Sequence, residues 1–137
     1  VASDLMSKKV INLTPQTTVS EAIVTLTQNK ISGAPVFDEN NKIIGVFTES
    51  DILKYFSVHP NEDISLLNVQ IIYTKEPLTV PPHMPLFKIQ KILMENVFRT
   101  IPVVDEDNHV LGMISRRAIM KYIFVVNKKL SQNIQSC

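Results

Sequence analysis

The chain has 137 residues, a formal net charge of +1 and an ordinary globular composition, with 45% hydrophobic and 20% charged residues. That composition excludes a disordered chain, which needs low hydrophobicity and high net charge, and the balanced charge argues against a nucleic-acid partner. The single cysteine is Cys137, so neither an intrachain disulfide nor a thiolate metal cluster can form, and we expect a reducing, cytoplasmic setting.

The first half of the chain predicts the element order strand, helix, strand, strand, helix. Residues 10–13 form the first strand, residues 34–37 and 43–47 form a hairpin around a polar turn, and residues 48–58 form the second helix. Apolar residues at helical spacing mark the first helix, namely Val19, Ala22, Ile23 and Leu26. The apolar face of the second helix consists of Ile52, Leu53, Tyr55 and Phe56.

The second half predicts the same order again. Residues 78–80 form a strand, residues 101–104 and 110–114 form a hairpin, and residues 116–126 form the last helix. The stripe of the helix between them consists of Leu86, Ile89, Leu93 and Val97. The longest apolar run, residues 122–126, is far shorter than the ~20 residues that span a bilayer, so we expect no membrane association.

An internal repeat explains why the two halves match. A shift of 67 residues aligns 13–56 with 80–123 without a gap, and 12 of 44 positions are identical. Average composition would give roughly 3 identities by chance. The chain is therefore divided into a first repeat at 1–59, a linker at 60–70, a second repeat at 71–126 and a polar tail that frays at 127–137.

Each repeat is a β-α-β-β-α unit with little core of its own, so the two must pack together. We expect an α/β (α+β) fold in which the repeats are related by a pseudo-twofold axis, with the small sheets facing each other and the helices outside. The charge is divided unevenly, at −3 for residues 1–68 and +4 for residues 69–137. This asymmetry points to anion contacts in the second half.

Several short motifs occur in a fixed order along the repeats. They are Asp4-Leu-Met6, Thr14-Pro15, Val19-x-Glu21-Ala22, Ala34-Pro-Val36 and Gly45-Val-Phe-Thr-Glu-Ser-Asp51. Together they resemble a tandem pair of cystathionine-β-synthase (CBS) domains, the Bateman module. The resemblance implies a non-catalytic, cytosolic sensor that needs no cofactor and binds an adenosine derivative such as AMP, ADP, ATP or S-adenosylmethionine in a cleft between the repeats. It also implies a homodimer that adjusts an enzyme, a transporter or a channel.

The start of the helix at 48–58 carries the most direct candidate site. The Asp51 carboxylate can accept hydrogen bonds from two ribose hydroxyls, and the Thr48 hydroxyl can donate to a phosphate oxygen beside backbone N–H groups that suit anions. Ser50 lies between them and is expected to contact the same ligand. The alternative is structural, because Thr48 and Asp51 also have the spacing of a helix capping box.

The second repeat departs from this pattern. It keeps a hydroxyl at Ser115 but has Ala118 where the acid belongs, so its cleft is empty or altered. Arg116 and Arg117 stand in the first turn of the helix, where cations oppose the helix dipole. They either meet the phosphates of a ligand held between the repeats or are solvated, paired with Glu106 or Asp107.

Further contacts follow from the resemblance alone. Thr14 is a polar contact or only ends a strand. The adenine slot is lined by residues that could equally be core strands, namely Ile11, Leu13, Ala34, Pro35 and Val36, with Ile101, Pro102 and Val103 as their counterparts.

Other functions lack the residues that they need. Three glycines supply no phosphate-binding loop, and the three histidines, at 59, 83 and 109, have no metal-ligand spacing, so no metal is expected. An empty dimerisation scaffold, a sensor of S-adenosylmethionine or NAD, and an unrecognised small enzyme remain as alternatives. We expect a homodimer because the last helix has more apolar residues than one face needs, namely Ile119, Met120, Tyr122, Ile123, Phe124, Val125 and Val126.

Overall fold

In a computed structural model, which describes residues 1–96 and 99–135, the chain forms two small antiparallel sheets with helices, and the expected α+β class is confirmed. One sheet has the order β1-β2-β3 and the other pairs β4 with β5. The strands are β1 (Gly33–Phe37), β2 (Ile43–Thr48), β3 (Thr74–Lys75), β4 (Thr100–Val104) and β5 (Val110–Ser115). The helices are α1 (Ala2–Leu5), α2 (Val19–Gln28), α3 (Glu49–Val58), the 3-10 turn η1 (Val69–Ile71), α4 (Leu86–Glu95) and α5 (Arg116–Gln135).

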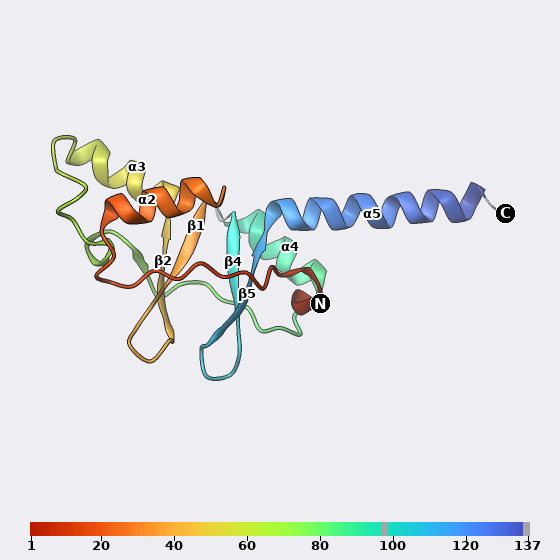
Figure 1. The fold of residues 1–137 in the computed structure, drawn as a ribbon. Coiled ribbons are helices and arrows are strands. Elements are labelled where there is room, and N and C mark those ends of the chain that lie inside the picture. Colours follow the sequence, from red (N-terminus) through yellow and green to blue (C-terminus); the bar gives the residue numbers. More distant parts are fainter. Residues whose placement is uncertain (97–98, 136–137) are drawn as a thin grey trace.

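The two hairpins are equivalent residue by residue at the 67-residue shift. Gly33 pairs with Thr48 as Thr100 pairs with Ser115, and each hairpin has one irregularity, after Val36 in the first and at the matching place in the second. Figure 1 shows the two sheets side by side, with the hairpin turns at one end and the helices at the other. The helix starts that carry the candidate residues therefore lie at the same end of both sheets.

The leading strand of each repeat is shorter than predicted. Residues 10–13 and 78–80 were expected to be strands, but each contributes one bridge, Leu13 to Val36 and Val80 to Val103. The residues before each bridge cross from the other sheet, because Ser7 still pairs with Met113 and Lys75 still pairs with Gly45. Each leading segment therefore reaches its own sheet only at the bridge residue, and the prolines that follow, which have no N–H to donate, end the pairing there.

The segment that precedes each repeat packs on the other repeat. Ala2 is fully buried in the core of the second repeat, and Ser7 bridges Met113 on β5. At the matching positions, Val69 is fully buried in the core of the first repeat, and Thr74 pairs with Val46 on β2. The two repeats thus exchange their leading segments, and residues 60–75 join the first unit.

Three apolar clusters hold this arrangement together. The first repeat buries Leu13, Val19, Ala22, Leu26, Ala34, Val36, Phe47 and Val69. The second buries Ala2, Val80, Ile89, Leu93, Ile101, Val103, Ile114 and Ile119. A third cluster, of Phe37, Ile43 and Val104, joins the two hairpins, and the Ile43 N–H donates to the Asn108 carbonyl across the same boundary.

Two helices differ from their predicted forms. In α3, Ile52 and Phe56 pack against the first core, but Leu53 is 73% exposed, because only the i, i+4 stripe faces the sheet. Helix α5 continues to Gln135 rather than ending near residue 126, since residues 127–135 contain neither proline nor glycine. The predicted stripe residue Val97 lies outside the described residues. Within the described part of the chain, no helix is both long and apolar enough to cross a membrane.

Candidate functional site

The start of α3 is organised around the carboxylate of Asp51. Its Oδ2 accepts the Thr48 N–H at 2.9 Å and the Thr48 hydroxyl at 3.0 Å, and the Asp51 N–H donates to the Thr48 hydroxyl at 3.2 Å. This is the complete capping box that was the structural alternative. A third donor comes from the segment between the repeats. The hydroxyl of Thr74 on β3, 23 residues after Asp51, donates to Oδ1 of Asp51 at 2.8 Å.

The cap leaves the Asp51 carboxylate room for a ligand. An ionised carboxylate offers about four acceptor positions, and Thr48 and Thr74 use three of them. One ligand hydroxyl can therefore bind directly, and a second would replace Thr74. Ser50 is exposed beside the carboxylate, at the first turn of the helix. Capping and ligand binding are compatible roles for this group.

The start of α5 has the same backbone arrangement without the acid. The Ser115 hydroxyl accepts the Ala118 N–H at 3.1 Å, and the Arg116 N–H donates to the Arg99 carbonyl, as the Glu49 N–H donates to the Ser32 carbonyl. Ala118 offers no carboxylate to a ribose. This half of the molecule therefore provides the helix start but lacks the acceptor of the other half.

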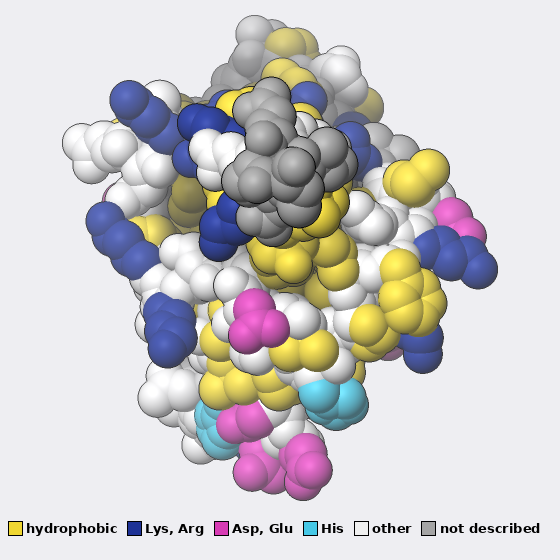
Figure 2. Space-filling view, turned by 90° about the vertical axis from the view of Figure 1, so that its right-hand side faces the viewer, with side chains coloured by type: hydrophobic (Ala, Val, Ile, Leu, Met, Phe, Trp, Pro, Cys, Tyr) yellow, Lys and Arg dark blue, Asp and Glu magenta, His cyan; other side chains and the backbone are white. Residues whose placement is uncertain are grey.

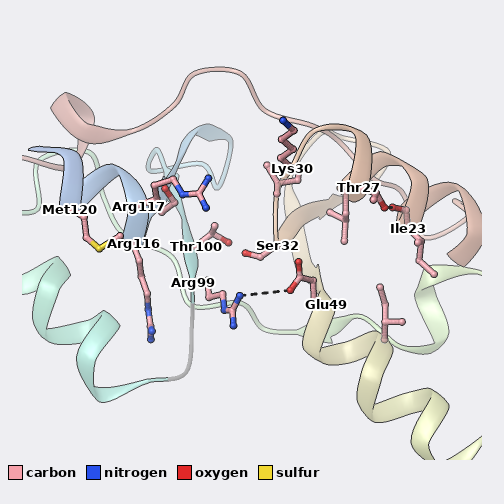
Figure 3. Close-up of a pocket in the computed structure, with 14 residues that line it drawn as sticks. Ile23, Thr27, Lys30, Ser32, Glu49, Arg99, Thr100, Arg116, Arg117 and Met120 are labelled. Atoms are coloured by element: carbon pink, nitrogen blue, oxygen red, sulfur yellow. Dashed lines mark hydrogen bonds and ion pairs between the residues drawn. The ribbon is translucent and has the colours of Figure 1, made fainter.

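A cavity of about 750 Å³ lies between the two repeats, at the helix end of the sheets. Its polar wall, among the described residues, has four cations and one carboxylate: Lys30, Arg99, Arg116, Arg117 and Glu49. Figure 3 shows Arg117 reaching from α5 toward Thr100 and Ser32, while Glu49 faces Arg99 from α3. Ser115 lines the cavity too. The excess of cations suits an anionic group.

The two arginines of α5 have different surroundings. One guanidinium nitrogen of Arg116, Nη2, donates to the carbonyls of Leu93 at 3.0 Å and Asn96 at 3.1 Å, at the C-terminal end of α4. A cation is favourable there because it complements the negative end of the helix dipole. Of the two alternatives for Arg116, these bonds take the place of a pairing with Glu106 or Asp107, and contact with a ligand stays a prediction, since Arg116 also lines the cavity. Arg117 is exposed and is the arginine of α5 that extends into the cavity.

Sequence reasoning missed three of the charged residues in the cavity: Lys30, Glu49 and Arg99. Nη1 of Arg99 lies 3.9 Å from Oε2 of Glu49, so this ion pair crosses from one repeat to the other. A signal was present in the alignment of the repeats, where Glu49 matches Arg116 and Ser32 matches Arg99. Such charge changes at matched positions distinguish the two helix starts.

The other predicted contacts are divided between the cores and a second cavity. Five strand residues are at most 2% exposed and pack in the cores, namely Ala34, Pro35, Val36, Ile101 and Pro102. Ile11 is partly exposed. Thr14 is exposed and lines a separate cavity of about 340 Å³, beside Phe37 and Asp38. The part of these residues in a ligand site stays a prediction.

Three potential metal ligands meet at the β4–β5 turn: Asp105, Asp107 and His109, with ligand atoms within 4.8 Å of one another. Backbone N–H groups of His109 and Asp107 donate to Asp105, and the bond from His109 contributes most to lowering the pKa of its carboxyl. Asp38 accepts N–H groups of Asn40 and Lys42 in the same way at the β1–β2 turn. Because the matching turn has no such ligand set, we interpret the Asp105 cluster as a turn motif.

The chain is similar to known proteins over most of its length. The family model "CBS domain" matches residues 2–58 and 69–125. The CBS domain-containing protein CBSX1, chloroplastic, of Arabidopsis thaliana is 29% identical, over 87% of this chain and 61% of that protein. Inosine-5'-monophosphate dehydrogenase of Methanocaldococcus jannaschii is 29% identical over 88% of this chain, which spans 23% of the enzyme. The crystal structure of CBSX2 in complex with AMP has a TM-score of 0.78 and 26% identity, covering 92% of this chain and 97% of that one.

Proposed function

The chain belongs to the CBS-domain family as a tandem pair, and on that premise we propose that it is a non-catalytic sensor that binds an adenine nucleotide (AMP, ADP or ATP) between its repeats. CBS pairs are regulatory modules, and similar pairs have been crystallised with AMP or with S-adenosylmethionine. That the ligand is an adenine nucleotide is our proposal for this chain, and the chemistry of its own cavity supports it.

The cation-rich cavity between the repeats is the observation that carries the proposal. Its volume of about 750 Å³ is within the range of small-molecule sites, roughly 300–1,000 Å³. Arg117 and Arg99 offer charge-assisted hydrogen bonds to phosphate, which are about twice as strong as neutral ones. The Asp51 carboxylate does not line the cavity, but it stands two residues after Glu49 at the same helix start and offers acceptors to a ribose. A nucleotide that spans these groups would contact both repeats at once.

A ligand panel tests the proposal. The protein is heated with adenosine, AMP, ADP, ATP, S-adenosylmethionine or NAD, with GMP as the control for the base. A ligand present at 100 times its Kd stabilises the fold by about 2.7 kcal/mol, which moves the Tm by several degrees in a domain of this size. We expect the largest shift from an adenine nucleotide and a small one from GMP. No shift with any ligand would contradict the proposal and favour the empty scaffold.

We also propose that the sensor is a homodimer joined through α5. Ile119 packs in the second core, but Phe124 is 67% exposed, and the run from Tyr122 to Val126 is exposed along its length. Successive residues of a helix are about 100° apart, so these five apolar side chains point to all sides of α5. A helix of this chain alone buries one face, and the remaining apolar side chains are left for a second copy to cover. Figure 2 looks onto the side from which α5 projects and shows apolar side chains gathered there, with lysines and arginines around them.

Light scattering at tens of micromolar tests the homodimer. We expect twice the chain mass for the wild type and the chain mass for the double variant Phe124→Ser/Val125→Ser. Leu66→Ser is the matched control, because Leu66 is 80% exposed on the loop after α3, and it should remain a dimer. A wild type with the mass of one chain would contradict the proposal.

A further inference from the structure

The cavity between the repeats contains one carboxylate, that of Glu49, among the residues that the structure describes. Glu49 is the first residue of α3, directly after Thr48, and it faces Arg99 from the opposite repeat (Figure 3). An anionic ligand that enters the cavity is therefore attracted by Arg99 and Arg117 and repelled by Glu49. The balance between these groups depends on how much charge the ligand carries.

The ion pair between Glu49 and Arg99 is easily opened. The oxygen and nitrogen are 3.9 Å apart, and the side chains are 55% and 71% exposed, so water screens their attraction. Exposed pairs of this kind contribute little to stability. A ligand phosphate can therefore take Arg99 from Glu49 at small cost, and the Glu49 carboxylate then remains beside the bound anion without its partner.

The matched position of the second repeat shows that a carboxylate is not required by the fold. Arg116 occupies that position, and its backbone N–H makes the bond to Arg99 that the Glu49 N–H makes to Ser32. The backbone of the helix start is the same with either side chain. Charge is therefore the property in which Glu49 differs from its counterpart.

We propose that Glu49 is a specificity-determining residue that limits the negative charge of the ligand. The surrounding cations favour a triphosphate over a monophosphate, and the Glu49 carboxylate makes this difference in affinity smaller. Coulomb repulsion grows in proportion to the ligand's charge, so Glu49 opposes ATP more strongly than AMP. The inference rests on the proposed function, because it concerns the anionic end of the same nucleotide.

The experiment compares AMP and ATP by titration calorimetry, without Mg²⁺, on the wild type and on Glu49→Gln. We expect the substitution to improve the affinity for ATP about tenfold and that for AMP about threefold, so that their ratio changes by about threefold. The change should shrink as salt is raised from about 0.05 M to about 0.5 M, because the charges are exposed.

Glu106→Gln is the matched control, since it removes the same charge from the exposed β4–β5 turn, and it should leave the ratio of affinities within about twofold of the wild type. The thermal melting of both variants shows that they are folded. An unchanged ratio in Glu49→Gln, or an equal change in Glu106→Gln, overturns the role of Glu49 but leaves the proposed function standing. A wild type that binds neither nucleotide overturns the proposed function and this inference with it.

Discussion

The starts of α3 and α5 have the same backbone arrangement but different charged side chains. Each helix follows the second strand of a hairpin. The hydroxyl of the residue before the helix accepts a hydrogen bond from the backbone N–H three residues later. The first N–H of the helix donates to the carbonyl of the residue just before the hairpin. The first start carries Glu49 and Asp51, whereas the second carries Arg116 and Ala118 at the same positions.

This difference shows which features the two repeats share and which they do not. Strand register, the turn bonds and the hydroxyl cap are the same in both halves. The charged positions face the cavity or the solvent and are free to change. Under the proposed function, the acceptor for a sugar would come from one repeat and the cations for an anion largely from the other.

The largest effect should come from adding a methyl group where the exchanged segments cross the sheets. A Cβ at Gly45 would meet the ring of Tyr73 and lie 2.5 Å from the Thr74 carbonyl oxygen. A Cβ at Gly112 would lie 2.7 Å from the Ser7 carbonyl oxygen and 2.7 Å from the sulfur of Met6, whose side chain is more flexible than the ring of Tyr73. We expect Gly45→Ala to lower the free energy of unfolding by about 3 kcal/mol and Gly112→Ala by about 2 kcal/mol.

Urea unfolding of both glycine variants measures these losses. Gly33→Ala is a milder control, because its nearest atom is a side-chain carbon of Thr48 at 3.1 Å. If Gly45→Ala is as stable as the wild type, the segment at 73–75 does not pack on the first repeat as described.

A smaller effect is expected at the caps themselves. Thr48→Ala removes both hydrogen bonds of the Thr48 hydroxyl, the one that it donates to Asp51 and the one that it accepts from the Asp51 N–H, whereas Ser115→Ala removes one bond from the Ala118 N–H. Loss of a cap costs about 1 kcal/mol, so we expect about 1–2 kcal/mol for Thr48→Ala and about 0.5–1 kcal/mol for Ser115→Ala. Thermal unfolding gives the order, and a reversed order would show that the two starts are not organised as described.

The smallest effect concerns Asp105 at the β4–β5 turn and depends on pH. The pKa of Asp105 is lowered, chiefly by the backbone N–H of His109, so its ionised form is favoured in the folded state. The stability that it contributes is present above the ordinary pKa of aspartate and is lost as pH falls through the lowered value. Asp105→Asn should therefore lose less stability than the wild type on acidification from pH 5 to about pH 3. Parallel pH profiles would contradict this.

The sequence predicted the elements that depend on local pattern but not the contacts that depend on topology. Apolar spacing located α2 and the hairpins, and the spacing of Thr48 and Asp51 predicted the cap. The partner of Asp51, Thr74, could not be found, because only the exchange of leading segments brings residues 23 apart in the chain together. The bond of Arg116 to the carbonyls that end α4 could not be found either, because those carbonyls are reached only when the helices are packed, and its contact with a ligand stays a prediction.

One titration tests most directly whether a ligand bridges the two halves. Adenosine and AMP are titrated into the wild type, Asp51→Ala and Arg117→Ala, with Arg116 left intact because it caps α4. Losing hydrogen bonds to a charged group costs about 1.5–3 kcal/mol, so we expect Asp51→Ala to weaken both ligands by about tenfold or more. Arg117→Ala should weaken AMP by a similar factor and leave adenosine unchanged. Equal binding of both ligands by Asp51→Ala and the wild type, or equal weakening of both by Arg117→Ala, would contradict the account.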